Sequence, residues 1–261
     1  MIPLKDENPT TTTPIVTMIL IAACVGIFVF IQPRSTAERG VVEELEFNYE
    51  TAAIPCEVTG GRPLTLDEIN RTLQGDETSC GSGSSGARPF FPGKNVYLAI
   101  VYSMFLHGSW LHLAGNMLFL WVFGNNIEDR KGKGTYIAFY LLAGLAATAA
   151  HILVQPDSTI PVVGASGAIA GVMGAYLVLF PNVPIKSLIL LGFIVFFRDV
   201  AAKWLLGIWL VSQFFINPNE GVAWMAHVGG FVFGVGAGLL WRATGTGERE
   251  RQAAPSPTPW R

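Results

Sequence analysis

The sequence predicts an all-α membrane protein with six transmembrane helices and a long loop between the first helix and the second. Two observations favour this fold class. Apolar residues make up 51% of the 261 residues and charged residues only 14%, whereas a soluble domain carries about 25% charged residues. The charged residues also leave six long stretches without any charge. This composition excludes a soluble enzyme, a nucleic-acid-binding protein and a secreted disulfide-rich scaffold.

The six charge-free stretches define the predicted helices, because a transmembrane helix needs roughly 17 to 25 apolar residues. The fifth stretch is short, but Trp204 and Trp209 near its start are typical of side chains that anchor a thin span at the membrane interface. Ser187–Phe197 is apolar but too short to cross a bilayer, so it is interpreted as an interfacial or re-entrant segment. The six stretches lie between Glu7 and Arg34, Lys94 and Glu128, Lys133 and Asp157, Asp157 and Lys186, Lys203 and Glu220, and Glu220 and Arg242.

The distribution of charge predicts the orientation of the chain. If residues 1–13 lie inside, the inner segments hold 11 of the 17 basic residues with 7 acids, and the outer segments hold 6 basic residues with 12 acids. Because basic residues concentrate on the cytoplasmic side, both termini are expected in the cytoplasm, and the host is expected to be a bacterial plasma membrane. The predicted organisation is a cytoplasmic N-terminus at 1–13, a membrane domain at 14–242 with an external loop at about 32–96, and a disordered cytoplasmic tail at 243–261.

The external loop contains two cysteines, Cys56 and Cys80. An oxidising compartment would allow a disulfide between them, and two free thiols are the alternative. The disulfide is favoured because it would close a loop that otherwise shows weak structural signals. Residues 80–87 (CGSGSSGA) are typical of a flexible linker. No soluble domain large enough to fold separately is predicted.

Polar side chains inside predicted membrane helices are candidates for function, because they are costly to bury in lipid. His112 and Asn116 are four residues apart in the second span, which places them on one face of a helix. Ser166 lies between glycines at the start of the fourth span, and His227 lies near the start of the sixth. In the predicted topology these three spans run in the same direction. The four side chains are therefore expected at a similar depth below the outer face.

Glycines in the fourth and sixth spans indicate how these side chains could meet. Their small-xxx-small spacing lets two helix backbones approach closely, although packing alone would explain the glycines themselves. Close packing would bring Ser166 within hydrogen-bond reach of His227, which is the arrangement of an activated nucleophile and its general base. His112, the Asn116 amide and the Ser166 backbone N–H could stabilise an oxyanion. No carboxylate is available to orient His227, so a two-residue dyad is expected. The glycines are Gly167, Gly171 and Gly174 on the fourth span and Gly230 and Gly234 on the sixth.

Three spaced motifs resemble those of the rhomboid intramembrane serine proteases. They are His107-x4-His112-x3-Asn116-Met117, Gly164-Ala165-Ser166-Gly167 and Ala226-His227-x2-Gly230-x3-Gly234. The resemblance covers roughly Tyr97 to Trp241 and implies a rhomboid-like bundle of six transmembrane helices. It implies Ser166 as nucleophile, His227 as base, and His112 and Asn116 in the oxyanion hole. It also implies transmembrane protein substrates that enter from the lipid bilayer near spans two and five and are cut near their outer end. Gly124, Glu128, Arg130 and Gly132 resemble a structural element of the family.

The sequence departs from the family pattern at two places. Some rhomboids have an aromatic residue where this chain has Ala170, and some have a Trp-Arg pair in the first loop that is missing between Gln32 and Gly93. His107 is interpreted as structural and His151 as interfacial. No cofactor, metal or nucleic-acid partner is predicted, and the oligomeric state is left open. The alternative function is a non-catalytic rhomboid-like binder of membrane proteins or a small transporter, since polar groups in a membrane can also line a solute path.

Overall fold

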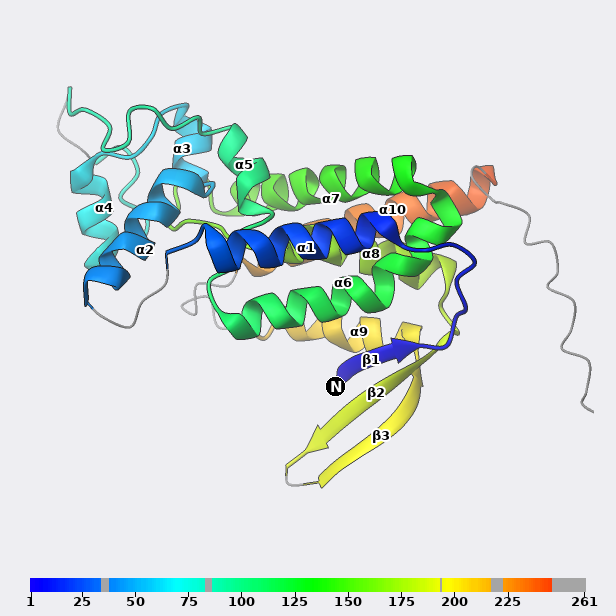
Figure 1. Cartoon of the computed structure of the whole chain (residues 1–261). Coiled ribbons are helices and arrows are strands. Elements are labelled where there is room, and N and C mark those ends of the chain that lie inside the picture. Colours follow the sequence, from blue (N-terminus) through cyan, green and yellow to red (C-terminus); the bar gives the residue numbers. More distant parts are fainter. Residues whose placement is uncertain (34–37, 83–85, 193, 217–222, 246–261) are drawn as a thin grey trace, which may run out of the picture.

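The computed structural model describes residues 1–33, 38–82, 86–192, 194–216 and 223–245, and most of these residues are helical. Six helices lie side by side with roughly parallel axes (Figure 1), one in each charge-free stretch. We call the end of this bundle where α6 is followed by α7 the turn end, and the opposite end the loop end. The six helices are α1 (Ile15–Phe30), α6 (Trp110–Lys131), α7 (Lys133–Val154), α8 (Ser166–Leu179), α9 (Ala202–Gln213) and α10 (Trp224–Thr244).

Length and hydropathy mark two of these helices as able to cross a membrane. Among the described residues these are α7 and α10, whereas α1 and α8 are apolar but shorter. Helix α6 is long, yet it contains three asparagines and a charged segment near its end, and α9 has only 12 residues. Six membrane crossings therefore stay a prediction. The end of the chain predicted as a disordered tail begins as helix, because α10 extends to Thr244, and residues 246–261 lie outside the described residues.

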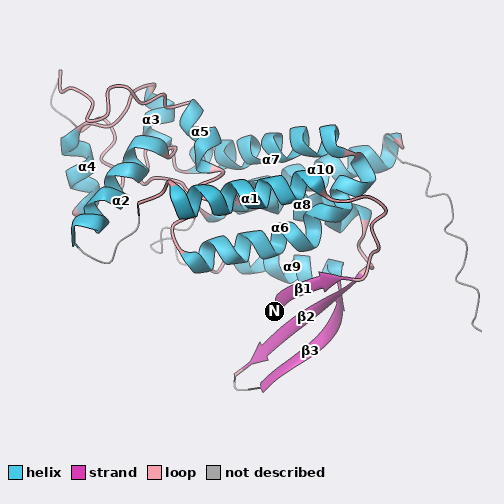
Figure 2. Ribbon diagram, in the orientation of Figure 1, coloured by secondary structure: helices cyan, strands magenta, loops and turns pink. Residues whose placement is uncertain are grey.

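A three-stranded antiparallel sheet contacts α6 and α9 at its base, and the outer part of its hairpin extends away from the helices (Figure 2). Its strands are β1 (Ile2–Asp6), β2 (Pro184–Leu191) and β3 (Ile194–Ala201), in the order β1-β2-β3. The prediction of an all-α fold is therefore wrong in two segments: the N-terminal residues and the apolar run Ser187–Phe197. That run forms most of a hairpin instead of an interfacial or re-entrant segment, with Gly192 at φ +60° in its turn.

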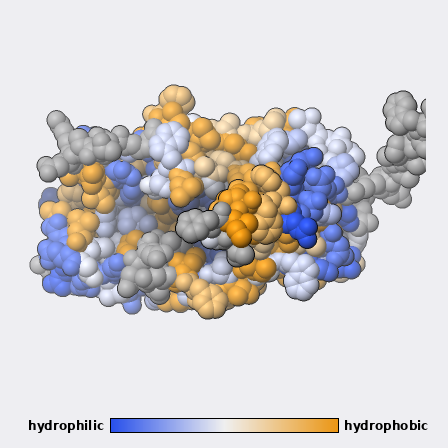
Figure 3. All heavy atoms as spheres, turned by 90° about the horizontal axis from the view of Figure 1, so that it is seen from below, coloured by the Kyte–Doolittle hydropathy of each residue, from blue (hydrophilic) through white to orange (hydrophobic). Residues whose placement is uncertain are grey.

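The residue types in this segment favour strands, although its apolar composition alone does not distinguish a strand from a helix. Ile189, Ile194 and Val195 are β-branched, and such residues favour strands. The usual alternation of apolar and polar residues is missing, because both faces of the outer half of the hairpin are apolar. A short apolar run of this kind cannot be assigned by periodicity alone. Seen from below, apolar side chains gather on the hairpin and over the middle of the bundle (Figure 3).

Glycines bring α8 and α10 into backbone contact. A Cβ atom added at Gly230 would collide with the carbonyl oxygen of Gly167, and one added at Gly234 would collide with the carbonyl oxygen of Gly171. Close approach at Gly174 likewise leaves no room for a side chain, because the carbonyl oxygen of Phe231 lies against it. The glycine spacing expected to allow tight packing therefore sets how closely these two helices approach.

The turn end of α6 holds the start of α1. The Glu128 carboxylate accepts hydrogen bonds from the backbone N–H groups of Val16 and Thr17, at 2.9 and 2.8 Å, and from the Thr17 hydroxyl at 2.8 Å. These N–H groups have no partner within their own helix, and a negative charge at a helix N-terminus is favourable. Gly124 has no space for a Cβ because Tyr136 Oη would lie 2.5 Å from it. Both residues are thus structural, as their motif predicts.

The loop between α1 and α6 is folded, contrary to the weak structural signals read from its sequence. It contains α2 (Glu38–Thr51), α3 (Pro55–Gly60), α4 (Leu66–Leu73) and α5 (Leu98–Ser103). We call residues 38–82 and 86–96 the loop unit. It has its own small apolar core, and the disulfide favoured from the sequence is formed between Cys56 and Cys80. Of the predicted linker at 80–87, residues 83–85 lie outside the described residues. The core consists of Tyr49, Ile54, Cys56, Leu64 and Ile69.

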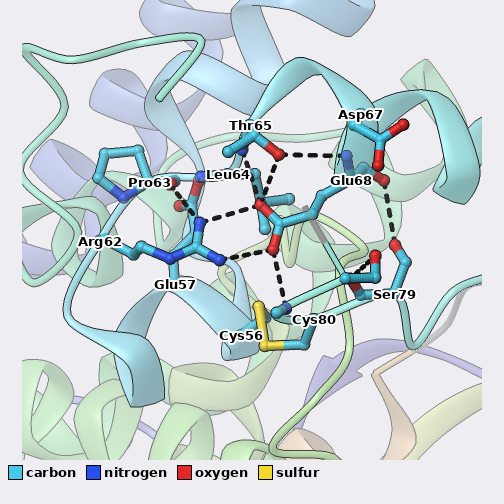
Figure 4. Close-up of polar contacts among 12 residues, drawn as sticks. Cys56, Glu57, Arg62, Pro63, Leu64, Thr65, Asp67, Glu68, Ser79 and Cys80 are labelled. Carbon is cyan, nitrogen blue, oxygen red and sulfur yellow. Dashed lines mark hydrogen bonds and ion pairs between the residues drawn. A yellow bond between two sulfur atoms is a disulfide. The ribbon is translucent and has the colours of Figure 1, made fainter. Parts of the chain in front are cut away.

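A buried carboxylate, Glu68, organises the loop unit beside the disulfide (Figure 4). Its oxygens accept hydrogen bonds from both terminal nitrogens of Arg62, at 2.9 and 2.6 Å, and from the backbone N–H groups of Thr65 and Gly81. Thr65 in turn caps α4 in a capping box with Glu68. Burial would raise the pKa of Glu68, but these hydrogen bonds outweigh burial and hold its pKa at about 2.

A second buried charge lies deeper in the loop unit. Lys94 Nζ is 2.5 Å from a carboxylate oxygen of Glu57, and the two side chains are only 1% and 2% exposed. Burial raises the pKa of the Glu57 carboxyl and lowers the pKa of the Lys94 ammonium, and each partner opposes the shift of the other. The ammonium also donates to the Tyr49 carbonyl at 2.6 Å, and Glu57 accepts from the Leu64 N–H at 2.9 Å.

The loop unit is bound to the segment that connects α7 to α8, residues 155–165. Three backbone hydrogen bonds join them: Cys56 N–H to the Ser158 carbonyl, Thr159 N–H to the Glu77 carbonyl, and Val162 N–H to the Ala53 carbonyl, at 2.8 to 2.9 Å. Since this connecting segment leads directly into Ser166, the loop unit supports the start of α8.

Candidate functional site

A cavity of about 850 Å³ lies at the loop end of the bundle. It is enclosed by the first turns of α6, α8 and α10, by the last turns of α7 and α9, and by residues 155–165. All four residues predicted to form a site, His112, Asn116, Ser166 and His227, line this cavity. Within the described residues, no three His, Cys, Asp or Glu side chains come close enough together to hold a metal ion.

Ser166 and His227 are in direct contact. Ser166 is the first residue of α8, and His227 lies in the first turn of α10. The Ser166 Oγ is 2.8 Å from the His227 Nε2, a distance typical of a strong hydrogen bond between a hydroxyl and a ring nitrogen. The glycine contacts between α8 and α10 begin at Gly167 and Gly230, one residue and three residues further along, so backbone packing controls this distance.

Gly164 lies beside both His112 and Ser166. Gly164 has φ +133°, a conformation that L side chains rarely adopt, and a Cβ added there would lie 2.9 Å from His112 Cε1 and 3.3 Å from Ser166 Oγ. A side chain at 164 would therefore separate His112 from Ser166. The His112 backbone N–H is bound by the Ser109 hydroxyl, which caps the N-terminus of α6.

Asn116 lies one helical turn after His112 and is 8% exposed. Its Nδ2 is buried without a hydrogen-bond partner among the described residues. A buried amide without a partner is costly, and this one lines the cavity close to Ser166. His107 is also buried, packs edge-on against the His112 ring, and is held through its backbone by Gln32. It supports His112 rather than lining the cavity.

Helix α9 adds two residues that the sequence analysis did not assign to the site. Gln213 Oε1 is 2.7 Å from His227 Nδ1, and the Trp209 ring lies 5.9 Å from the His227 ring, measured between centroids. Trp209 therefore packs in the site rather than anchoring the helix at a membrane interface. These contacts support His227 in the absence of an aromatic residue at Ala170, which is fully buried. The signal in the sequence was a glutamine four residues after a tryptophan in an apolar stretch.

His151 likewise differs from its interpretation as an interfacial residue. It is 6% exposed and lines the cavity together with Thr148 on the same helix. Glu77 and Thr78 of the loop unit line the cavity from the other side. The external loop thus contributes to the wall of the site, which its sequence did not indicate.

Comparison with known proteins identifies the family. The family model of the rhomboid domain matches residues 94–244, more than half of the chain. This chain belongs to the rhomboid family. The match contains every cavity residue described above except Glu77 and Thr78, which belong to the loop unit. The match confirms the family resemblance read from the motifs.

Three relatives illustrate the range of the family. The chain is 32% identical to presenilin-associated rhomboid-like protein A, mitochondrial, of Danio rerio over 57% of this chain and 40% of the relative. It is 28% identical to rhomboid protein 1, mitochondrial, of Saccharomyces cerevisiae over 59% of this chain and 44% of the relative. It is 34% identical to rhomboid protease GluP of Bacillus subtilis over 43% of this chain and 21% of the relative. The chain spans less than half the length of each of these relatives.

The comparison corrects the prediction of a bacterial plasma membrane. Several matched rhomboids, from Danio rerio, Saccharomyces cerevisiae and Bos taurus, are mitochondrial proteins. The predicted bacterial location, with both termini in the cytoplasm, is therefore wrong. The error arose because an excess of basic residues on one side indicates orientation and does not distinguish one type of membrane from another.

Proposed function

We propose that this chain is a serine endopeptidase that cleaves transmembrane segments of other membrane proteins. The observation that carries the proposal is the 2.8 Å contact between Ser166 Oγ and His227 Nε2 in the wall of a cavity of about 850 Å³. A serine hydroxyl is a weak nucleophile until an adjacent base accepts its proton. Family membership supports the proposal, because the matched relatives include a rhomboid protease.

The reaction follows from the positions of the side chains. His227 Nε2 accepts the hydroxyl proton as Ser166 Oγ attacks the carbonyl carbon of the substrate. The negative oxygen of the tetrahedral intermediate requires hydrogen-bond donors. We assign this donor role to the unpartnered Asn116 amide, to His112 and to the Ser166 backbone N–H at the start of α8. His227 then gives its proton to the leaving amine as the peptide bond breaks. In the second half His227 accepts a proton from a water molecule that attacks the acyl carbon, the ester bond to Ser166 breaks, and His227 returns the proton to Ser166 Oγ as the carboxylic acid product leaves.

The surface supports a substrate that comes from a lipid bilayer. Large apolar side chains are exposed on several helices of the bundle, where water would make them unfavourable. A peptide bond in a membrane helix is shielded by its own hydrogen bonds, so the cleaved segment must unwind to reach Ser166. We place the protein in a mitochondrial membrane, on the basis of its mitochondrial relatives. The exposed side chains include Ile19, Phe30, Leu142, Ile208, Val211, Val232 and Leu239.

The test is labelling of the detergent-solubilised protein with a fluorophosphonate probe, which reacts with activated serines. Wild type should be labelled, and Ser166→Ala and His227→Ala should not. Ser158→Ala is the matched control, because Ser158 also lines the cavity but its hydroxyl accepts a hydrogen bond from the Ile160 N–H and contacts no catalytic group. Labelling that persists in Ser166→Ala would place the nucleophile elsewhere. A wild-type protein that resists the probe would contradict the protease and favour a non-catalytic binder.

A further inference from the structure

We propose that Gln213 is a positioning residue, the third member of a Ser166–His227–Gln213 triad, which holds the His227 ring in the form that can act as a base. The proposal rests on the proposed function. Gln213 is the last residue of α9, is 5% exposed and lines the cavity. Its Oε1 lies 2.7 Å from the His227 Nδ1, on the side of the ring opposite to Ser166.

The orientation of the Gln213 amide is fixed by its other hydrogen bonds. The Nε2 group donates to the Trp209 carbonyl at 3.0 Å and lies 3.2 Å from the Ser212 hydroxyl. If the amide were turned over, its oxygen would face the Trp209 carbonyl and its N–H₂ group would face the imidazole. The Trp209 contact would then lose its donor, and the Ser212 hydroxyl could not donate to the turned oxygen because it already donates its proton to the Trp209 carbonyl at 2.6 Å. The oxygen is therefore the atom that faces His227.

This orientation determines the tautomer of His227. An amide oxygen can only accept a hydrogen bond, so the Nδ1 must carry the proton. A neutral imidazole has a single N–H group, and Nε2 is then left unprotonated with a free lone pair. That lone pair faces Ser166 Oγ, as a general base requires. The opposite tautomer would place two acceptors, the unprotonated Nδ1 and the Gln213 Oε1, face to face.

Gln213 also stabilises the His227 ring after the Ser166 proton has moved to Nε2. The imidazolium that forms keeps its Nδ1–H bond to the amide oxygen, and hydrogen bonds to a charged group are stronger than neutral ones. Trp209, one turn earlier on the same helix, packs beside the ring. A single helix thus provides both the polar and the apolar support of His227, and it does so without a carboxylate.

The experiment compares rates of fluorophosphonate labelling across pH for three full-length variants. Gln213→Met keeps the length of the side chain but removes the acceptor, so labelling should slow by about 10- to 100-fold in protein that is still folded. Gln213→Glu restores an acceptor with a negative charge. Its labelling should recover at high pH, and the pH of half-maximal rate on the acid side should rise by about one unit or more, because a carboxylate favours the protonated ring. Gln155→Met, at another glutamine that lines the cavity, should label like wild type.

The tautomer itself is measured by nitrogen-15 NMR of protein labelled at its histidine rings. We expect a His227 signal with a protonated Nδ1 and an unprotonated Nε2 in the wild type, and loss of this pattern in Gln213→Met. A protonated Nε2 in the wild type, or wild-type labelling rates and pH profile in Gln213→Met, would overturn the triad. Those outcomes would leave the proposed protease intact as long as labelling still depends on Ser166. A loss of that dependence would instead refute the proposed function.

Discussion

Replacing Gly234 with alanine tests whether glycine packing sets the geometry of the site. The added Cβ would collide with the Gly171 carbonyl oxygen, and it would also lie 2.8 Å from the Gly171 Cα, 0.6 Å short of ordinary contact at 3.4 Å. Helices α8 and α10 must therefore separate by more than that amount. Overpacking of this kind costs about 1–3 kcal/mol.

The separation would be transmitted to Ser166 and His227, because each lies less than two helical turns from the collision. Their hydrogen bond is 2.8 Å long, and a further opening of about 1 Å would exceed the length of a hydrogen bond. A misplacement of about 1 Å can reduce a catalytic rate by about 100-fold. We therefore expect Gly234→Ala to slow fluorophosphonate labelling of Ser166 by about 100-fold and to lower the unfolding temperature.

The matched control is Gly236→Ala in the same helix, where nothing lies within 4 Å of the added Cβ. There the alanine should leave labelling unchanged and should stabilise the helix by up to about 1 kcal/mol, because alanine favours helix more than glycine does. Both variants are measured in one detergent, by labelling rate and by thermal unfolding. Wild-type labelling in Gly234→Ala, or equal damage in both variants, would refute the argument from packing.

Three further predictions concern the loop unit. Replacing Cys56 and Cys80 together with serine should destabilise the unit by about 3 kcal/mol and speed its cleavage by trypsin; cleavage at the wild-type rate would contradict a stabilising disulfide. The pKa of Glu68 is lowered from 4.5 to about 2, so its contribution to stability is complete above pH 4.5 and is lost as the pH falls toward 2. Digestion of the wild-type loop unit by pepsin should therefore accelerate over that range. In Glu68→Gln the rate of digestion should depend less on pH. Lys94→Met leaves the buried Glu57 carboxylate without its ion-pair partner and should lower the free energy of unfolding by about 3–5 kcal/mol. Adding Glu57→Gln should restore part of that stability, as measured by thermal unfolding.

The positions of the main helices, and the meeting of His112, Asn116, Ser166 and His227 at one cavity, could be predicted from the sequence, because both depend on local patterns. Charge-free stretches mark helices that bury apolar side chains, and the motifs around His112, Ser166 and His227 are short and specific. The contact between Ser166 and His227 required only that two glycine-rich helices approach closely. Their chemical roles stay a proposal.

Other features depend on contacts between distant residues, and their local signals were too weak to assign them or were absent. The hairpin at 184–201 is apolar on both faces, so its period could not distinguish strand from helix. The loop unit owes its order to the Cys56–Cys80 bond and to the buried charges around Glu68, which come together only in the folded chain. Gln213 is an ordinary residue in its own helix, and only the fold places it beside His227.

Because the loop unit is attached to residues 155–165, two different parts of the chain form the cavity. Ser166 and His227 belong to the part that matches the family model, which begins at residue 94, whereas Glu77 and Thr78 in the wall of the cavity come from the part before it. Substitutions in the loop unit can therefore reshape this wall of the cavity while the contact between Ser166 and His227 stays as it is.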